Sequence, residues 1–343
     1  MSIEIVLLDF NFLDLTLLKC NYCPILIVIL IPKEESMFRS FDEMIDFVKK
    51  MEKKQVVAVV GADKPVAVEA AVDMVVENLA IPVLFGNEEK IKHLIEGTVL
   101  EGKVEIVPCA DNVESCSKAA DYAADGRVNI LLKGSVETAQ IMKAVFRKEN
   151  GLKAAAVVSD ILMYEDPLSK GENKRLVGIM DGGIIPLPTL EQKIEMTRGA
   201  VQVFHKLGFE KPRVAYISAI ETVSPRIQST VDAAEIQRMK AEGELDDINA
   251  YLEGPYAIDN VISEYAAKVK GINSVMAGCA DILIFPNIES GNVLGKLVHY
   301  WGGAQTGHVI VGAKVPVLLS SRADDARAKI NSLVLGITVN AHS

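Results

Sequence analysis

The sequence predicts an α/β protein whose sheets are rich in parallel strands. From residue 55 onward, short apolar runs alternate with amphipathic stretches, which is typical of successive strand and helix units. Half of the residues are hydrophobic, so there is enough apolar side chain to bury a sheet on both faces. At 343 residues the chain is longer than one typical core, and two domains are therefore expected.

The first 36 residues differ from the rest of the chain. The apolar run at 24–32 is too short to span a bilayer as a helix, for which about 20 residues are needed. Acidic residues stand where a secretory signal would be positive, and no small-residue cleavage site follows. Met37 then opens an amphipathic helix, in which Ser40 and Glu43 form a capping box. We expect the folded protein to begin near Met37, with residues 1–36 as an atypical extension or a start-site artefact.

Two series of strand and helix patterns follow, with a boundary expected near Gly151. Between Leu162 and Arg175, polar residues and turn formers indicate a surface loop. The amphipathic segments Leu190–Leu207 and Tyr256–Val269 predict helices. The predicted strands of the first series are Gln55–Ala62, Ala80–Gly86, Val104–Ala110 and Val128–Gly134, and those of the second are Ala154–Asp160, Arg175–Asp181, Arg213–Ala219, Ala280–Asn287 and Val309–Ser320.

The net charge and the spacing of cysteines and histidines exclude several classes of function. A net charge of −10 argues against a nucleic acid or an anionic membrane as partner, because both need a basic surface. Cys20 and Cys23 form a C-x-x-C without a second pair, so neither a disulfide framework nor a zinc site is expected. The five histidines show no metal-ligand spacing, and no histidine base is indicated either.

Two turns in the first series are candidate anion sites. Val59–Pro65 is a strand, a glycine turn and a helix start, whose free N–H groups can hold an anion, although a plain turn explains the pattern equally well. It contains neither a dinucleotide nor a P-loop fingerprint. Lys133, Gly134 and Ser135 end a buried strand and can face a ligand together. The alternative is that Ser135 only caps the next helix, with Thr138 on its exposed face.

Polar residues also follow predicted strands of the second series. Ser218 and Glu221 come directly after a strand, at the end where ligands bind in open α/β sheets. Asp259 lies in the first turn of a helix, where the helix dipole alone explains a carboxylate. Gly291 permits close backbone approach, and the adjacent Asn292 offers both a donor and an acceptor.

The last polar cluster, Ser320–Asp324, combines hydroxyl, guanidinium and carboxylate groups after a buried strand. Arg322 can grip a phosphoryl group through its forked donors, and Ser321 can hydrogen-bond a developing charge. The alternative is a helix N-cap, because a serine before an acidic first turn is a common helix start. Both roles are compatible, so the cluster is a candidate for phosphate binding and proton transfer.

A linked series of motifs runs from Met37 to the end of the chain. Each motif is weak alone, but their order is specific. The motifs are Leu132-Lys133-Gly134 with Thr138, Pro188-Thr189-Leu190-Glu191-Gln192-Lys193, Ser218-Ala219 with Glu221, Gly254-Pro255-Tyr256-Ala257-Ile258-Asp259, Ala280-Asp281-Ile282-Leu283, Glu289-Ser290-Gly291-Asn292, Gly312-Ala313-Lys314 and Ser321-Arg322-Ala323-Asp324. In this order they resemble the phosphate acetyl/butyryltransferase family, and most of all its phosphate butyryltransferases.

The resemblance implies a two-domain α/β fold like that of isocitrate and isopropylmalate dehydrogenases, with parallel-rich sheets and an interdomain cleft that binds ligands. Residues 37–151 with 311–343 would form domain I, and residues 152–310 would form domain II. It also implies a cytoplasmic homodimer that transfers an acyl group, with butyryl as the first candidate, reversibly between coenzyme A and orthophosphate to give an acyl phosphate. Coenzyme A is then a substrate, and no bound cofactor or metal is expected.

In the chemistry that the resemblance implies, the coenzyme A thiolate attacks the acyl phosphate directly, without an acyl-enzyme. Arg322 would bind the phosphoryl group, and Ser321 would stabilise the reacting acyl oxygen. Asp324 or Asp325 would take the thiol proton. The further residues expected to contact substrates are Lys133, Gly134, Ser135, Thr138, Lys143, Ser218, Glu221, Asp259, Gly291 and Asn292.

The chain departs from the acetyl-specific branch of the family at three places. In that branch the acid lies further from the Ser-Arg pair, where this helix reads Ala326-Arg327-Ala328. Lys143 stands where the branch tends to have an arginine contact to phosphate, so bidentate geometry is lost there. Gly295 stands where a larger residue is usual, which can reshape the pocket.

Two other functions remain open. A related phosphate acyltransferase could use acyl carrier protein, which would require a basic docking patch, and the sequence has no evident one. A catalytically impaired paralogue could bind coenzyme A or acyl phosphates as a sensor, or could assemble with a partner kinase.

Overall fold

The computed structural model describes residues 3–10, 13–20, 26–32, 37–169, 171, 174–319 and 325–342. The chain divides into two compact units, Met1–Met37 and Phe38–Ser343. In the first unit, the strands β1 (Ile3–Phe10), β2 (Leu13–Cys20) and β3 (Leu26–Pro32) form an antiparallel sheet in the order β1-β2-β3.

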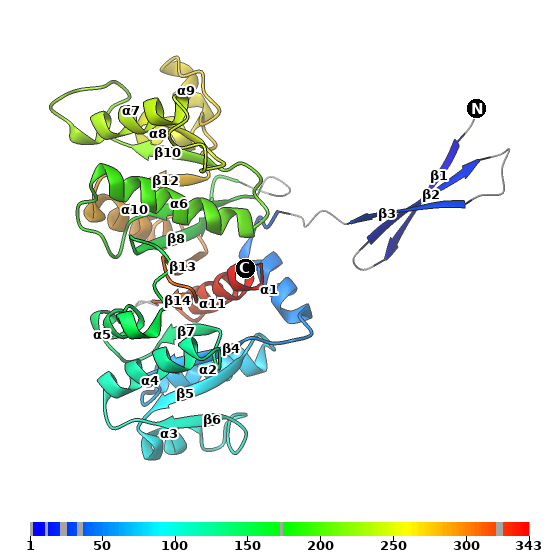
Figure 1. Ribbon diagram of the computed structural model, residues 1–343, viewed down its shortest axis with the longest axis vertical. Coiled ribbons are helices and arrows are strands. Elements are labelled where there is room, and N and C mark those ends of the chain that lie inside the picture. Colours follow the sequence, from blue (N-terminus) through cyan, green and yellow to red (C-terminus); the bar gives the residue numbers. More distant parts are fainter. Residues whose placement is uncertain are drawn as a thin grey trace. The chain divides into compact units, whose positions relative to one another are not determined.

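The described part of the second unit is built on one mixed sheet of eleven strands, most of them parallel (Figure 1). Their order is β11-β10-β12-β9-β8-β13-β14-β7-β4-β5-β6. The α/β class with a parallel-rich sheet is therefore confirmed. The strands are β4 (Val56–Val60), β5 (Ile81–Gly86), β6 (Glu105–Pro108), β7 (Ile130–Lys133), β8 (Ser159–Glu165), β9 (Leu176–Met180), β10 (Arg213–Ile217), β11 (Tyr251–Tyr256), β12 (Ile282–Ile284), β13 (Thr306–Val311) and β14 (Val317–Leu318).

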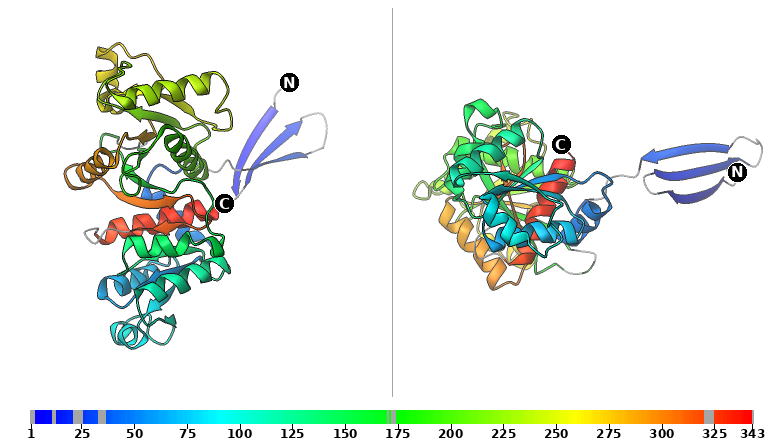
Figure 2. Two further views of the ribbon diagram at one scale, coloured as in Figure 1. Left: turned by 60° about the vertical axis from the view of Figure 1, so that its left-hand side comes forward. Right: turned by 90° about the horizontal axis from the view of Figure 1, so that it is seen from below.

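Helices cover both faces of this sheet, which is why its central strands are apolar along nearly their whole length. All five residues of β9 are buried, for example. Figures 1 and 2 show the last helix, α11, crossing the middle of the unit. The helices are α1 (Phe41–Lys50), α2 (Pro65–Val76), α3 (Glu88–Ile95), α4 (Asn112–Ala124), α5 (Thr138–Val145), α6 (Leu190–Lys206), α7 (Gln228–Ala241), α8 (Ile258–Ile262), α9 (Glu264–Val269), α10 (Ile288–Tyr300) and α11 (Ala326–Ala341), with a 3-10 turn at Lys148–Asn150.

The strands change direction near the middle of the sheet. On one side β14, β7, β4, β5 and β6 run parallel to one another, and on the other side β9, β12, β10 and β11 do the same. Between these two groups, β13 is antiparallel to both of its neighbours, β14 and β8, and β8 is antiparallel to β9. The two parallel groups therefore point in opposite directions along the ladder.

Helices α5 and α10 cover the same face of the sheet on either side of this change of direction. On the α10 side, a Cβ added to Gly295 would lie only 2.7 Å from Leu162 Cδ1 on β8. On the α5 side, Ile310 of β13 belongs to the buried cluster that α5 packs into. His308 alternates with Ile310 along β13 and pairs with Leu162 across the ladder, so these three side chains share one face.

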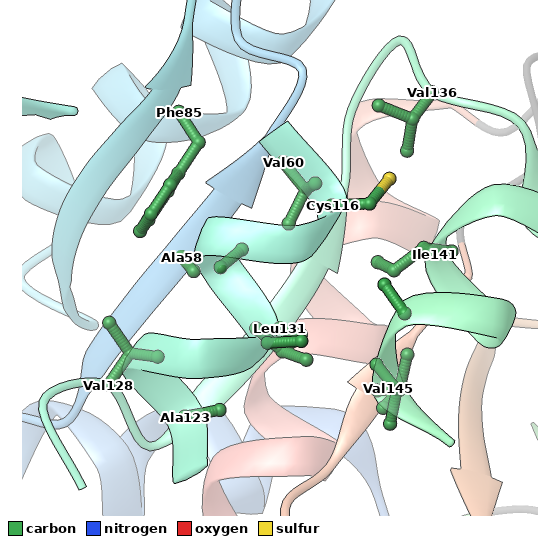
Figure 3. Packing of buried hydrophobic residues seen from close by; sticks show 14 of the residues in the cluster. Ala58, Val60, Phe85, Cys116, Ala123, Val128, Leu131, Val136, Ile141 and Val145 are labelled. Atoms are coloured by element: carbon green, nitrogen blue, oxygen red, sulfur yellow. The ribbon is translucent and has the colours of Figure 1, made fainter. Parts of the chain in front are cut away.

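The cluster under α5 is the larger of the two apolar cores beneath that face. Figure 3 shows Ile141 and Val145 of α5 gathered around Leu131 of β7 with the side chains of the neighbouring strands. The second core lies under α10 and α8, around Leu283 of β12 and Ile179 of β9. Each parallel group of strands therefore has its own core.

Several predicted segments are shorter in the structure, such as the strand predicted at Ala280–Asn287, which is β12 at Ile282–Ile284. Three others differ in more than their length. Val309–Ser320 is wrong as one strand, because β13 ends at Val311 and Gly312 turns the chain with a φ of +97° before β14. Tyr256–Val269 is wrong as one helix, since it divides into α8 and α9 at Ser263. The strand predicted at Ala154–Asp160 begins five residues later and runs into the expected loop, because Ser159–Glu165 pairs on both edges.

Candidate functional site

The turn after β7 forms one wall of a pocket of about 340 Å³. Three lysines line this pocket, Lys64 at the start of α2, Lys133 at the end of β7 and Lys329 on α11. Gly134 and Ser135 line it as well. Three ammonium groups around one hollow favour a ligand with several negative charges.

Gly134 and Ser135 are fixed by the neighbouring turn after β4. A Cβ on Gly134 would lie 2.7 Å from the Gly61 carbonyl oxygen, so only glycine fits there. The Ser135 hydroxyl lies 2.8 Å from Asp63 Oδ1 and 2.9 Å from the Gly61 carbonyl oxygen. The alternative that Ser135 caps the next helix is wrong, because Glu137 is the N-cap residue of α5.

Two more predicted residues, Thr138 and Lys143, lie on α5. Thr138 is its first residue and Lys143 is in its last turn, and both side chains are exposed. The structure therefore places them at opposite ends of one short helix, with Thr138 adjoining the turn that forms the lysine pocket.

A second group of predicted residues follows β10 and β11. The Ser218 hydroxyl lies 2.7 Å from that of Ser229. Glu221 and Asp259 share Lys270, whose Nζ lies 3.6 Å from one carboxylate and 3.1 Å from the other. Parallel strands bring these residues to one edge of the sheet, as predicted, but they lie on the other side of the change of direction from the lysine pocket.

Gly291 and Asn292 hold α10 against the turn that follows β9. A Cβ on Gly291 would lie 2.4 Å from the Asp181 carbonyl oxygen, so the first turn of α10 touches that backbone. Asn292 Nδ2 donates to the Gly182 carbonyl oxygen at 2.8 Å. Asn287 caps the helix by accepting from the Ser290 N–H at 3.0 Å.

Beneath this turn is a buried polar cluster that the sequence did not single out. His308 Nδ1 lies 3.0 Å from Asp160 Oδ2 and 3.3 Å from its Oδ1. Asp160 and Asp181 are only 6% and 2% exposed. Asp181 accepts hydrogen bonds from the N–H groups of Asp160 at 3.2 Å, Gly183 at 2.6 Å and Ile184 at 2.8 Å.

Burial raises the pKa of Asp181 to about 6, and the nearby Asp160 carboxylate adds to this effect. The three N–H donors act in the opposite direction. One sequence signal was available, because Asp160 and Asp181 each end a predicted strand. The contact between Asp160 and His308 could not be predicted from the sequence, since it depends on β13 and β8 being antiparallel neighbours in the sheet.

The predicted catalytic residues Ser321, Arg322 and Asp324 lie outside the described residues. Asp325 is described, and its Oδ1 accepts from the Ala328 N–H at 2.7 Å as the N-cap of α11. The first turn of α11 contains no acidic side chain. The predicted alternative, a serine N-cap before an acidic first turn, is therefore wrong, because Asp325 is the cap residue and no acidic side chain follows it in that turn.

No group of three or more histidine, cysteine or acidic side chains that could hold a metal ion occurs in the described part of the chain. The cysteines described from residue 37 onward, Cys109, Cys116 and Cys279, are free. None of the described helices is long and apolar enough to cross a membrane.

Comparison with known proteins gives a consistent set of relatives. The family model described as "Phosphate acetyl/butaryl transferase" matches residues 107–337. Phosphate butyryltransferase from Clostridium beijerinckii is 34% identical over 308 residues, covering 90% of this chain and all of that protein. Phosphate acetyltransferase from Thermotoga maritima is 38% identical over 279 residues, covering 81% of this chain and 92% of that protein.

Solved structures agree at the level of the fold. A branched-chain phosphotransacylase from Enterococcus faecalis superposes with a TM-score of 0.73 at 28% identity, covering 84% of this chain and all of that one. A 4-hydroxythreonine-4-phosphate dehydrogenase from Klebsiella pneumoniae superposes with a TM-score of 0.52 at 12% identity, covering 84% of this chain and all of that one. This similarity shows a shared fold alone.

Proposed function

Since the chain belongs to the phosphate acetyl/butaryl transferase family and is an acyltransferase, we propose that it transfers a butyryl group reversibly between coenzyme A and orthophosphate. The observation that carries this proposal is the similarity to a phosphate butyryltransferase over that relative's whole length. A relative named phosphate acetyltransferase matches at similar identity, so the preference for butyryl is the finer part of the proposal.

The lysine pocket supports a substrate with several phosphate groups. Coenzyme A carries such groups at the end remote from its thiol, and Lys64, Lys133 and Lys329 line a hollow that suits them. We propose that this pocket receives the phosphates of coenzyme A. The pocket is partly open, so each lysine contributes a modest amount to affinity.

For the chemistry, we propose direct attack of the coenzyme A thiolate on the acyl phosphate in a ternary complex. Arg322 binds the phosphoryl group and Ser321 stabilises the acyl oxygen in this scheme. Of the two aspartates expected to take the proton, Asp325 already serves as the cap of α11. We therefore assign the role of proton acceptor to Asp324.

The finer features of the fold belong to the same proposal. Residues 37–151 with 311–343 would form one domain and 152–310 the other, with an isocitrate-dehydrogenase-like cleft between them. The change of strand direction at β13 and β14 supports a boundary near residue 311. A homodimer working in the cytoplasm completes the proposal, as the resemblance implies.

Phosphate-dependent release of thiol from butyryl-coenzyme A tests this function directly. A panel of acyl groups from acetyl to hexanoyl, with branched members, then ranks kcat/KM. We expect butyryl or a close neighbour to rank first, with steps of about 1–3 kcal/mol per methylene. Tight binding of coenzyme A without turnover would instead favour the sensor, and turnover only with butyryl-acyl carrier protein would favour the carrier-dependent enzyme.

A further inference from the structure

A hollow of about 1040 Å³, which the proposed function does not use, opens at the carboxyl ends of β10 and β12. It is lined by Val223 in the loop after β10 and by Pro286 and Asn287 directly after β12. The two strands are parallel neighbours, but the chain continues from β10 to β11 on one side of the pair and from β12 to β13 on the other. In open α/β sheets, ligands bind in the crevice between two strands that the chain leaves in opposite directions.

The helices that follow these two strands cover opposite faces of the sheet. On one face, the Tyr216 hydroxyl of β10 lies 2.8 Å from that of Thr197 on α6. Tyr216 is also near α7, because a Cβ added to Gly254 would lie 2.9 Å from Tyr216 Cβ and 3.1 Å from Ala233 Cβ. The next residue along β10, Ala215, belongs to the core under α8 and α10 on the other face. The first turns of α6 and α7 therefore wall the hollow from one face.

A buried lysine with unused hydrogen-bond donors lines this hollow. The Lys193 side chain is 7% exposed, and its Nζ lies 2.5 Å from Asp232 Oδ2. Gln228 Nε2 donates to the other oxygen of the same carboxylate at 2.7 Å. An ammonium group has three donors, and within the described residues Asp232 is the one acceptor for this group. Two N–H groups of Lys193 are therefore available to an oxygen atom of a ligand.

The first turn of α7 adds donors close to this lysine. Gln228 and Ser229 are the first two residues of the 14-residue helix, and both line the hollow. The first N–H groups of an α-helix have no acceptor within it, and the N-cap residue Ile227 makes no side-chain cap hydrogen bond. The helix dipole adds a positive potential at the same end. A negatively charged oxygen atom is therefore favoured next to Lys193.

The charged side chains of the lining limit how much negative charge a ligand can carry. They form two pairs, Lys193 with Asp232 and Arg238 with Glu235, so the lining has no net formal charge. A ligand with two or more negative charges would be repelled by the carboxylates of Asp232 and Glu235. A single carboxylate group matches the available donors without this repulsion.

The rest of the lining is largely apolar. Its apolar side chains include Leu187, Leu190, Val223, Val231 and Pro286. Leu187 and Val223 are 74% and 57% exposed, so a chain of methylene groups laid against them would remove apolar surface from water. The volume of the hollow is at the upper end of the range for small-molecule sites, about 300–1,000 Å³.

We propose that this hollow binds an aliphatic monocarboxylate. Its carboxylate lies at Lys193 and the start of α7, and its chain lies against the apolar side chains. Butyrate belongs to this class of ligand, but the site does not depend on the proposed function.

Calorimetric titration of the full chain measures this binding without turnover. Hexanoate should bind about four-fold more tightly than pentanoate, and pentanoate about four-fold more tightly than butyrate, because each methylene buries further apolar surface. Hexanamide has nearly the same shape without the charge and should bind about 10–100-fold more weakly than hexanoate. Equal binding of the acid and the amide, or no binding of hexanoate, would overturn the inference.

Two variants test the position of the ligand. Lys193→Met should raise Kd for hexanoate about 10–100-fold. Because that change leaves Asp232 without its partner, Ala234→Trp provides a second measurement, since it fills the hollow and keeps the ion pair. It should abolish binding while circular dichroism stays that of the wild type. The matched control is Lys211→Met, an exposed lysine over the Tyr251 ring, which should keep the wild-type Kd.

An unchanged Kd in folded Ala234→Trp would overturn the inference. Arg322→Ala separates this site from the proposed catalytic site, since hexanoate should bind that variant as it binds the wild type. Loss of binding in Arg322→Ala would place the ligand at the catalytic loop and would also overturn the inference. A wild type that binds hexanoate but transfers no acyl group would support the inference and reject the proposed function alone.

Discussion

Asp181 uses one carboxylate to hold three backbone N–H groups, those of Asp160, Gly183 and Ile184. It thereby shapes the turn on which Asn292 rests and fixes the start of β8 next to it. Asp181 is only 2% exposed, and its carboxylate oxygens accept all three of these hydrogen bonds. Its protonation state therefore affects the stability of the folded chain.

The free energy of unfolding should depend on pH through Asp181. Burial raises its pKa to about 6 from 3.8, so the folded state binds the proton more tightly than the unfolded chain. This stabilisation is present in full below pH 3.8 and is lost as the pH rises through about 6. The free energy of unfolding should fall by on the order of 3 kcal/mol between these two pH values. Urea unfolding of the wild type and of Asp181→Asn at several pH values measures this change in the free energy of unfolding. A difference between them that is independent of pH would contradict the assignment.

Arg322→Ala should lose most of the proposed activity while the fold persists. A hydrogen bond to an ion contributes about 1.5–3 kcal/mol, which predicts a fall in kcat/KM of at least about 10–100-fold. Arg327→Ala is the matched control, because that arginine pairs with Asp42 on α1. Steady-state rates and circular dichroism of both variants check this. A near-normal rate for Arg322→Ala would remove it from the site.

At the scale of elements, the position of α10 depends on glycines that let its backbone approach its neighbours closely. Two of its residues, Gly291 and Gly295, allow it to lie against the turn after β9 and against β8. A Cβ on Gly291 would meet backbone, which cannot easily give way, whereas a Cβ on Gly295 would meet the end of the flexible Leu162 side chain. The glycine at 295, expected to reshape the pocket, thus also sets how near the helix lies to the sheet.

Gly291→Ala should destabilise the protein and weaken the proposed site. Its Cβ would lie 2.4 Å from the Asp181 carbonyl oxygen, so the helix must move, at a cost of about 1–3 kcal/mol. Val293→Ala on the same helix is the control, since that side chain is 56% exposed. Thermal unfolding of both variants tests the contact. An unchanged midpoint for Gly291→Ala would show that α10 does not lie this close.

The lysine pocket should act on binding rather than on chemistry. Lys64→Ala and Lys329→Ala should each raise KM for coenzyme A up to about five-fold and leave kcat nearly unchanged, as expected for exposed ion contacts. High salt should reduce the difference. Lys118→Ala, an exposed lysine paired with Glu114, is the control. If KM stays constant in both pocket variants, coenzyme A binds elsewhere.

The sequence predicted those parts of the site that depend on one strand and its end. Ser218 follows β10, and Asn292 lies near the start of the helix after β12, as expected where an apolar run followed by polar residues marks the edge of a parallel sheet. Their contacts with substrates stay a prediction. The Asp160 and His308 pair was not predicted. These residues are 148 positions apart, and their contact depends on which strands are antiparallel neighbours, which apolar runs do not reveal.

At the scale of the whole molecule, each of the two units has its own sheet. The second unit begins at Phe38 and already contains α1, whose Phe41 and Met44 are fully buried. Removing residues 1–36 should therefore leave both the unfolding temperature and the acyl transfer of the chain unchanged. Calorimetry and kinetics of the shortened chain test this. A large fall in either would show that the first unit contributes to the fold or to the site.

The strand ladders near the middle of the sheet differ in length. Among the described residues, six pairs join β13 to β8, the pair Ile310 and Val317 joins β13 to β14, and two pairs join β14 to β7. A tilt along the seam at β14 would disturb few described ladder hydrogen bonds, and α11, which packs on β13, β14 and β7, spans it. Since Asp160 and His308 lie together on the well-paired side with α10, they should move as one rigid piece when the halves tilt. The contact between Asp160 and His308 would then keep its geometry while its distance to α5 changes.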